Sequence, residues 1–267
     1  MTVPASLTFV GTATTVLRLG AVTLLTDPNF LHRGQRVHLG YGLFSARRTE
    51  PAMQPEDLPP LDAVLLSHLH GDHFDRPARF RLPRQLPVFT TPHAAPRLRR
   101  WGFRRSMGLD TWATSEVTHG SDRVRVTAVP GTHAPGPLAR LLPPVMGSVL
   151  ELERAGAVVS TIYITGDTLC RPWLGEVRER FPQLDAMVIH LGGTRALGVL
   201  VTMDEQQGAD LVELLRPPVT IPIHYDDYTV FRSPLAAFLA EVGRRGGPGE
   251  VRPVSRGDTV ALPVRPV

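Results

Sequence analysis

The segment His68-x-His70-x-Asp72-His73 places four side chains that can bind metal ions within six residues. It directly follows the apolar run 63–66, which predicts a buried strand. At the end of an extended strand, His68 and His70 point to the same side and can bring two imidazoles onto one ion at about 2.0–2.1 Å. Asp72 and His73 are adjacent, so their side chains diverge and suit a second ion beside the first. The spacing therefore predicts metal binding.

Three further polar residues follow apolar runs elsewhere in the chain. They are His133 after the run 124–129, Asp167 after the run 162–164, and His224 after the run 219–223. Each is expected where a strand ends, as in the 68–73 motif. Two metal ions need more ligands than the four in that motif. Histidine and carboxylate side chains at these strand ends can supply them.

The order of these features resembles that of the metallo-β-lactamase-fold hydrolases: a strand, the His-x-His-x-Asp-His motif, a later histidine, a later aspartate and a last histidine. Two early segments, Gly11-x-x-Thr14-Thr15-Val16 and Leu-Leu-Thr-Asp-Pro at 24–28, add to it. They look most like the branch that contains ascorbate-6-phosphate lactonase and the N-acyl-phosphatidylethanolamine phospholipase D enzymes. The resemblance extends over about residues 8–233.

The resemblance implies an α/β protein, a four-layer αβ/βα sandwich with a binuclear metal site at one edge. It assigns His68, His70 and His133 to the first ion, Asp72, His73 and His224 to the second, and Asp167 to a position that bridges the two. Asp27 matches a position that supports the ligands from a second layer.

Two side chains are candidates for moving a proton during the reaction. Asp72 is one, and His190 is the other because it ends the apolar run 186–189 outside the seven-ligand pattern. For His190, a buried histidine with a purely structural role is an equal alternative. For Cys170, close to Asp167, the expectation is a small buried apolar side chain.

Metal-assisted hydrolysis is the expected reaction. A hydroxide held by both metal ions would attack an ester, lactone or phosphodiester of a small, anionic substrate. Zinc is the first expectation for the two divalent ions, with manganese or iron as alternatives, since nitrogen and oxygen ligands suit all three. Two other functions stay open: phosphodiesterase or nuclease-type activity on nucleic acid, and a non-catalytic metal-binding protein of the same fold.

Composition excludes several other chemistries. All 29 basic residues among the 267 are arginine, so Schiff-base, pyridoxal-phosphate and P-loop lysines are absent. The single cysteine excludes an internal disulfide and any multi-cysteine metal site. Residues 1–6 lack the pattern of a signal peptide, and no apolar run reaches the length of a membrane span. A cytoplasmic protein is therefore expected.

The net charge of +4 is small for a nucleic-acid-binding protein. The one local cluster of basic residues, around Trp101 and Phe103, consists of Arg97, Arg99, Arg100, Arg104 and Arg105. We expect a solvated helix face here, with RNA binding as the alternative. A small-molecule substrate is the expected partner, nucleic acid is not, and a homo-oligomer stays open.

The elements that must position the site alternate along the chain. Strands are expected at 7–10, 14–18, 22–25, 63–66, 88–90, 124–129, 148–153, 158–165, 186–189 and 219–223, and near 251 and 260. Helices are expected at 94–101, 174–181, 204–215 and 234–242, and residues 32–50 as a long loop. No linker divides the chain, so residues 1–267 are expected to form a single domain.

Overall fold

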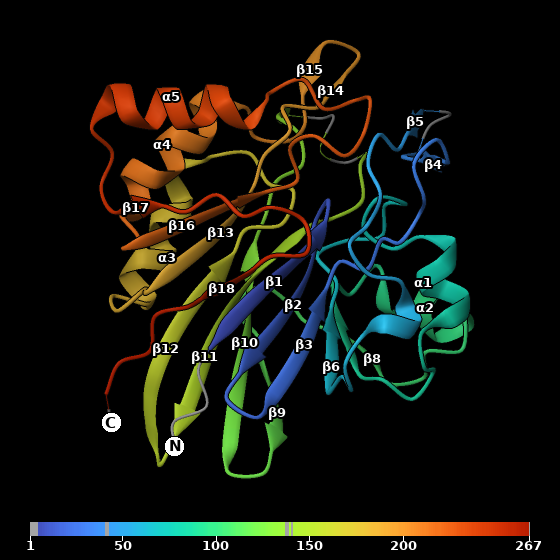
Figure 1. Cartoon of the computed structure of the whole chain (residues 1–267), viewed down its shortest axis with the longest axis vertical. Helices are drawn as coiled ribbons and strands as arrows, with labels where there is room; N and C mark the ends of the chain where they lie inside the picture. The colour runs from blue at the N-terminus through green and yellow to red at the C-terminus, as the bar shows by residue number, and fades with distance from the viewer. Residues whose placement is uncertain (1–4, 41–42, 137–138, 140, 267) are drawn as a thin grey trace.

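The computed structural model describes residues 5–40, 43–136, 139 and 141–266. The signal-peptide prediction concerns residues 1–6, of which 1–4 lie outside this range. Two large mixed β-sheets lie face to face in the middle of the molecule. Helices flank the pair on both sides, with α1 and α2 on the right of Figure 1 and α3, α4 and α5 on the left.

The first sheet has the strand order β18-β1-β2-β3-β6-β7-β8. Its strands are β1 (Ser6–Gly11), β2 (Thr14–Leu19), β3 (Val22–Thr26), β6 (Ala63–Leu65), β7 (Val88–Thr90), β8 (Ser106–Gly108) and β18 (Thr259–Ala261). The strands from β18 to β3 pair antiparallel, whereas β3, β6, β7 and β8 run parallel. The carboxyl ends of β3, β6 and β7 therefore lie at one edge of the sheet.

The second sheet has the strand order β17-β16-β13-β12-β11-β10-β9. Its strands are β9 (Thr114–His119), β10 (Asp122–Pro130), β11 (Met146–Arg154), β12 (Ala157–Ile164), β13 (Ala186–His190), β16 (Val219–Ile223) and β17 (Glu250–Val251). Strands β12, β13, β16 and β17 run parallel, and β9 to β12 pair antiparallel. In this sheet, too, parallel strands end together at one edge.

Three apolar layers hold the sandwich together. The inner faces of both sheets pack against each other through side chains such as Phe9, Leu17, Leu150 and Ile162. The outer face of the first sheet is covered by α1 (Arg76–Arg81) and α2 (Ala95–Arg100). The outer face of the second is covered by α3 (Gly175–Arg180), α4 (Glu205–Leu215) and α5 (Leu235–Arg245). The expected four-layer αβ/βα sandwich is confirmed.

The longer helices lie close to their expected positions because their boundaries carry local signals. Asp204 caps α4 by accepting a hydrogen bond from the Gln207 amide. The αL residues Arg216 and Gly246 end α4 and α5. Short 3-10 turns lie at Pro55–Asp57 and Pro172–Leu174.

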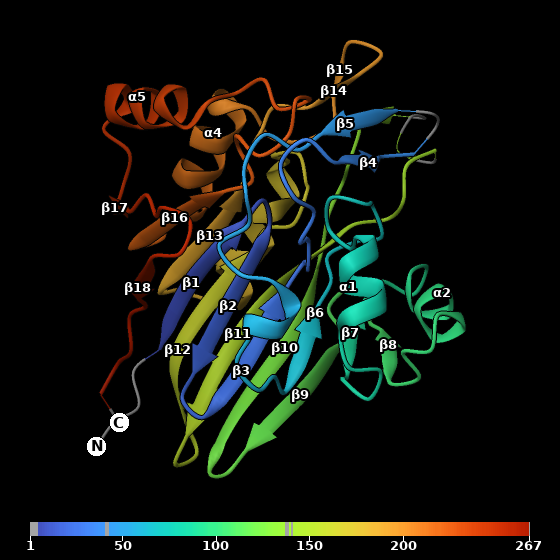
Figure 2. The same cartoon turned by 45° about the vertical axis from the view of Figure 1, so that its right-hand side comes forward.

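The expectation of a long loop over residues 32–50 is wrong. Strands β4 (Arg36–His38) and β5 (Phe44–Ala46) form an antiparallel pair there, with residues 41–42 outside the described part. Strands β14 (Arg195–Ala196) and β15 (Val199–Leu200) form a second small pair. Both small pairs lie at the same end of the sandwich, at the top of Figures 1 and 2. Within the described residues, no helix is both long and apolar enough to traverse a bilayer.

Candidate metal centre

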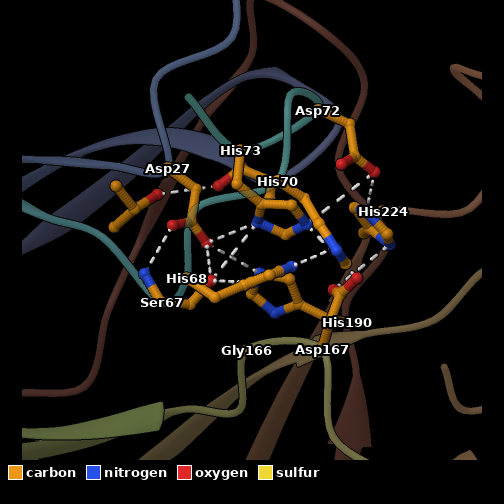
Figure 3. A network of polar contacts seen from close by, with 12 residues as sticks. Asp27, Ser67, His68, His70, Asp72, His73, Gly166, Asp167, His190 and His224 are labelled. Atoms are coloured by element: carbon orange, nitrogen blue, oxygen red, sulfur yellow. Dashed lines mark hydrogen bonds and ion pairs between the residues drawn. The ribbon is translucent and has the colours of Figure 1, made fainter. Parts of the chain in front are cut away.

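The predicted ligands meet at one edge of the sandwich, and both sheets contribute to them. The 68–73 motif follows β6 of the first sheet, whereas His133, Asp167 and His224 follow strands β10, β12 and β16 of the second. Figure 3 shows the side chains of the 68–73 motif, Asp167 and His224 converging on a common interior space. The structure brings all seven predicted ligands into two adjacent groups, all of them at least nine-tenths buried.

The first group contains His68, His70 and His133. His68 Nε2 lies 2.9 Å from His70 Nδ1, and His70 Nδ1 lies 3.2 Å from His133 Nε2. Ligand nitrogens around a tetrahedral ion are about 3.3 Å apart when each bond is about 2.05 Å. The spacing of the three nitrogens therefore approaches that of a shared metal ion.

The second group contains Asp72, His73, Asp167 and His224. His73 Nε2 lies 3.2 Å from Asp167 Oδ2 and 3.9 Å from Asp72 Oδ2. His224 Nε2 lies 3.5 Å from Asp72 Oδ2. Several buried atoms of this group have no hydrogen-bond partner among the described residues: Asp72 Oδ1, His73 Nε2, Asp167 Oδ1 and His224 Nε2. Buried polar atoms without partners are costly, and a cation would satisfy them.

Hydrogen bonds on the far side of the rings fix which nitrogen of each histidine is free. The carbonyl of Val201 lies 2.6 Å from His133 Nδ1, and that of Leu191 lies 3.0 Å from His224 Nδ1. A carbonyl only accepts, so Nδ1 carries the proton in both rings. The lone pair of each Nε2 is then directed into the cluster, as metal binding requires.

Asp27 and Ser67 orient the imidazole rings of His73 and His68 in the 68–73 motif in a similar way. His73 Nδ1 donates to Asp27 Oδ2 at 3.0 Å, and Ser67 donates to the same carboxylate through its amide at 2.7 Å and its hydroxyl at 2.8 Å. The Ser67 oxygen can then accept from His68 Nδ1 at 3.0 Å. Burial raises the pKa of the Asp27 carboxyl, but the charge of His73 and hydrogen bonds from His190 and His73 outweigh it and hold this pKa at about 2. Asp27 therefore stays ionised.

In the first group, the protonation state of the ring nitrogens also suits metal ligands; in the second group, burial is outweighed by the charge of Asp167, which raises the pKa of His73 and of His224 in the absence of a metal. Burial, reinforced by the neighbouring charge of His133, lowers the pKa of His70 to about 3. Burial likewise lowers the pKa of His68 well below its usual value, with the charges of His73 and His70 adding to the effect. Neutral imidazole is the form that binds a metal. The donor set, its orientation and its unpartnered atoms fit two adjacent divalent ions.

His190 lies behind the second group. It ends β13, is completely buried, and its Nε2 lies 3.5 Å from Asp27 Oδ2. His190 Nδ1 lies 3.3 Å from the hydroxyl of Thr165. Burial lowers the pKa of His190, although a hydrogen bond to Asp27 opposes that shift. The geometry joins His190 to Asp27 and His73 and leaves its predicted proton-transfer role as a prediction.

Contacts from the 32–50 segment, which were not expected from the sequence, also support the 68–73 motif. Arg47 is buried and donates to the side chain of Asn29, whose amide donates to the Gly71 carbonyl at 3.1 Å. A Cβ at Gly71 would lie 2.7 Å from the His38 carbonyl, so β4 packs directly on the motif. One arginine among the four in the 32–50 segment gives no sequence signal for this role. Ser67, directly before the motif, could have been considered from its position.

A small cavity opens onto the proposed ligands. Its volume is about 40 Å³, and its walls include His70, Asp72, His133 and Asp167. Apolar and hydroxyl side chains from the β14–β15 region, Val201 and Thr202 among them, close its other side. The cavity has room for a reacting group beside the ligand cluster.

The chain matches the Beta-lactamase superfamily domain over residues 23–225. It belongs to this family. A metal-dependent hydrolase of Anaeromyxobacter sp. (strain K) is 26% identical over 248 residues, which cover 91% of this chain and 84% of that protein. The chain is therefore a metal-dependent hydrolase of the beta-lactamase superfamily, as expected.

Solved structures with low sequence identity share the fold. An isothiocyanate hydrolase from Delia radicum gut bacteria has a TM-score of 0.81 at 21% identity, covering 97% of this chain and 99% of that one. A metallo-β-lactamase-fold protein from Bacillus subtilis has a TM-score of 0.63 at 15% identity, covering 97% and 99%. The fold expected from the resemblance is confirmed, and the specific branch of the superfamily stays a prediction.

Proposed function

We propose that this chain hydrolyses an ester, lactone or phosphodiester of a small, anionic substrate with the help of two divalent metal ions. The observation that carries the proposal is the pair of adjacent donor groups whose lone pairs are directed at a shared interior space. His68, His70 and His133 would hold one ion, Asp72, His73 and His224 the other, and Asp167 would bridge them. When bound, such ions lower the pKa of a shared water and polarise the substrate oxygen.

Two of the side chains at this centre, Asp72 and His190, have different proposed roles. Asp72 lines the small cavity, so the carboxylate oxygen that does not hold the ion can accept a proton beside the reacting group. His190 contacts Asp27 and is absent from the walls of that cavity. We assign it a positioning role, in which it holds the carboxylate that orients His73.

The donor chemistry favours zinc, with manganese or iron as alternatives, because imidazole and carboxylate ligands suit all three. Both sheets supply ligands, which supports one hydrolase domain over residues 1–267 rather than two separable parts. Two divalent charges exceed the charge of the two carboxylates among the proposed ligands, so the site would attract an anionic substrate.

Elemental analysis of protein purified with metal present, followed by a substrate panel, tests the proposal. The panel contains p-nitrophenyl diesters and monoesters, lactones and an isothiocyanate, the last because one structural neighbour is an isothiocyanate hydrolase. We expect about two metal ions per chain and turnover of at least one ester, lactone or diester. Metal content near zero would overturn the binuclear proposal, and turnover of the isothiocyanate alone would overturn the substrate class.

Two histidine variants distinguish the loss of a metal ligand from the general effects of replacing a histidine. His70→Ala removes a proposed ligand and should lower both bound metal and activity. His119→Ala is the matched control, because His119 is exposed and pairs with Asp62 on the surface. It should keep both. An undiminished rate in His70→Ala would reject the scheme.

A further inference from the structure

A second, larger cavity adjoins the proposed metal centre. Its volume is about 640 Å³, within the range of about 300–1,000 Å³ typical of small-molecule sites. His70 and Leu142 line both this cavity and the small one beside the ligands. The small cavity, at about 40 Å³, holds little more than a reacting group. The larger cavity therefore offers space for the remaining atoms of a substrate that reacts at the metal centre.

Among the described residues, the walls of this larger cavity combine one arginine and three histidines, His38, His70 and His93, with an apolar surface. Arg97 projects from α2, and Trp101, Phe74 and Leu142 provide aromatic and aliphatic surface. The Arg97 guanidinium lies 5.0 Å from the centre of the Trp101 ring, a cation–π contact that restrains it. No carboxylate is among the residues that line this cavity within the described part of the chain.

Arg97 differs from the other members of the arginine cluster in its surroundings. Its guanidinium forms no hydrogen bond or ion pair with any residue that the structure describes. Arg99, by contrast, donates to the Ser106 carbonyl at 2.7 Å, and Arg105 to the Gln85 carbonyl at 3.4 Å. Arg100 lies on the same helix and lines neither cavity. Arg97 is thus the member of the cluster that faces the cavity with its donors unfilled.

We propose that the larger cavity binds the non-reacting part of the substrate, with Arg97 pairing with a carboxylate or phosphate on it and Trp101 covering its flat, apolar body. This inference rests on the proposed function and makes it more specific. The substrate class becomes an ester, lactone or diester with an unsaturated or apolar body and an anionic group away from the scissile bond. Guanidinium is suited to this pairing because its donors match the two oxygens of an anion.

Ligand binding tests the inference without any need for turnover. The probe is 4-nitrobenzoate, whose nitro group quenches tryptophan fluorescence, and the neutral comparison is 4-nitrobenzamide. Both are titrated into metal-loaded wild-type protein, Arg97→Gln and the matched control Arg100→Gln. We expect Arg97→Gln to weaken binding of the benzoate about tenfold, the usual effect of losing one charged hydrogen-bond partner, and to leave the amide unaffected. Arg100→Gln should bind both probes as the wild type does.

Three results would overturn the inference: no saturable quenching of the wild type by 4-nitrobenzoate, equal effects of the two arginine variants, or equal loss of both probes in Arg97→Gln. The kinetic counterpart compares a carboxylated p-nitrophenyl ester with its neutral analogue. Arg97→Gln should raise KM for the charged ester about tenfold and keep kcat. Binding that depends on Arg97 without any turnover would refute the proposed function alone. Turnover that is indifferent to Arg97 would refute this inference alone.

Discussion

Asp27→Asn is the most informative single change outside the proposed ligands. Asp27 is buried behind the site and receives hydrogen bonds from the amide and hydroxyl of Ser67 and from His73 Nδ1. Asparagine keeps the size of the side chain but removes its negative charge. It also places either an amide nitrogen or a neutral oxygen against His73. We expect weaker metal binding and a less stable fold.

The size of both effects follows from the geometry. In the metal-free protein, burial is outweighed by the charge of His73, which lowers the folded-state pKa of Asp27 from 3.8 to about 2, so its carboxylate stabilises the metal-free fold by about 2 kcal/mol above pH 3.8. That contribution is lost as the pH falls from 3.8 through about 2. Asp27→Asn should therefore lose about 2 kcal/mol at neutral pH. Removing a partner that orients a ligand typically weakens metal binding about 10- to 100-fold, which corresponds to about 1.4–2.8 kcal/mol.

Two measurements check these values: competition with a fluorescent chelator for metal affinity, and urea unfolding for stability. Asp122→Asn is the matched control, because Asp122 is also a buried carboxylate that accepts from a backbone amide, Ala21, at 2.7 Å. It begins β10, whereas His133 follows the end of that strand. The control should lose stability and keep its metal affinity. Metal affinity of Asp27→Asn within twofold of wild type would refute the reasoning.

Three further changes probe other parts of the molecule. His190→Gln should weaken metal affinity in the chelator assay, because His190 contacts Asp27, which orients His73. The pH profile of kcat/KM should stay the same. Loss of one limb of that profile would instead establish that His190 transfers a proton. Leu197 is 99% exposed and has a φ of 49°, a left-handed conformation that asparagine tolerates better than leucine. Leu197→Asn should therefore raise the free energy of unfolding, measured in urea, by about 1 kcal/mol. An unchanged or lower free energy of unfolding would contradict this. Burial, with the charge of Asp210, raises the pKa of Cys170 to about 11, so at pH 8 iodoacetamide should modify it about a hundredfold more slowly than free cysteine. The rate of modification should increase with pH up to about pH 11. A reaction at pH 8 as fast as that of free cysteine would contradict the raised pKa of Cys170.

The proposed ligands could be located from the sequence because the 68–73 motif is specific, and because the order of the resembled family selects His133, Asp167 and His224 among the polar residues that follow apolar runs. Parallel strands bring their carboxyl ends to one edge, so Asp167 and His224 had to lie near one another once β12, β13 and β16 paired in parallel. His133 reaches the same edge because β10 and β12 both pair antiparallel with β11 and therefore run in the same direction. The longer helices could be predicted for a similar reason, since α4 combines an apolar face with a capping aspartate, Asp204.

The parts that were missed depend on contacts between distant segments. Only Val117 is buried in β9, so its apolar pattern is too weak to predict a strand without knowledge of its partner β10. The acceptors that orient His133 and His224 are backbone carbonyls, which have no residue signature. The expectation of a solvated face for the arginine cluster did not include the cavity beside Arg97, because segments far apart in the sequence form this cavity, among them α2, residues 69–74 and residues 141–144.

The larger cavity and the proposed ligands lie on different elements, and this separation offers a route for enzyme engineering. Arg97, Trp101 and Leu142 belong to α2, its end and a loop, whereas most ligands follow strands of the two sheets. Libraries that randomise these three positions should change substrate preference while the metal affinity is retained. His70 is the exception, since it is a proposed ligand that also lines both cavities. It should stay fixed in any such library.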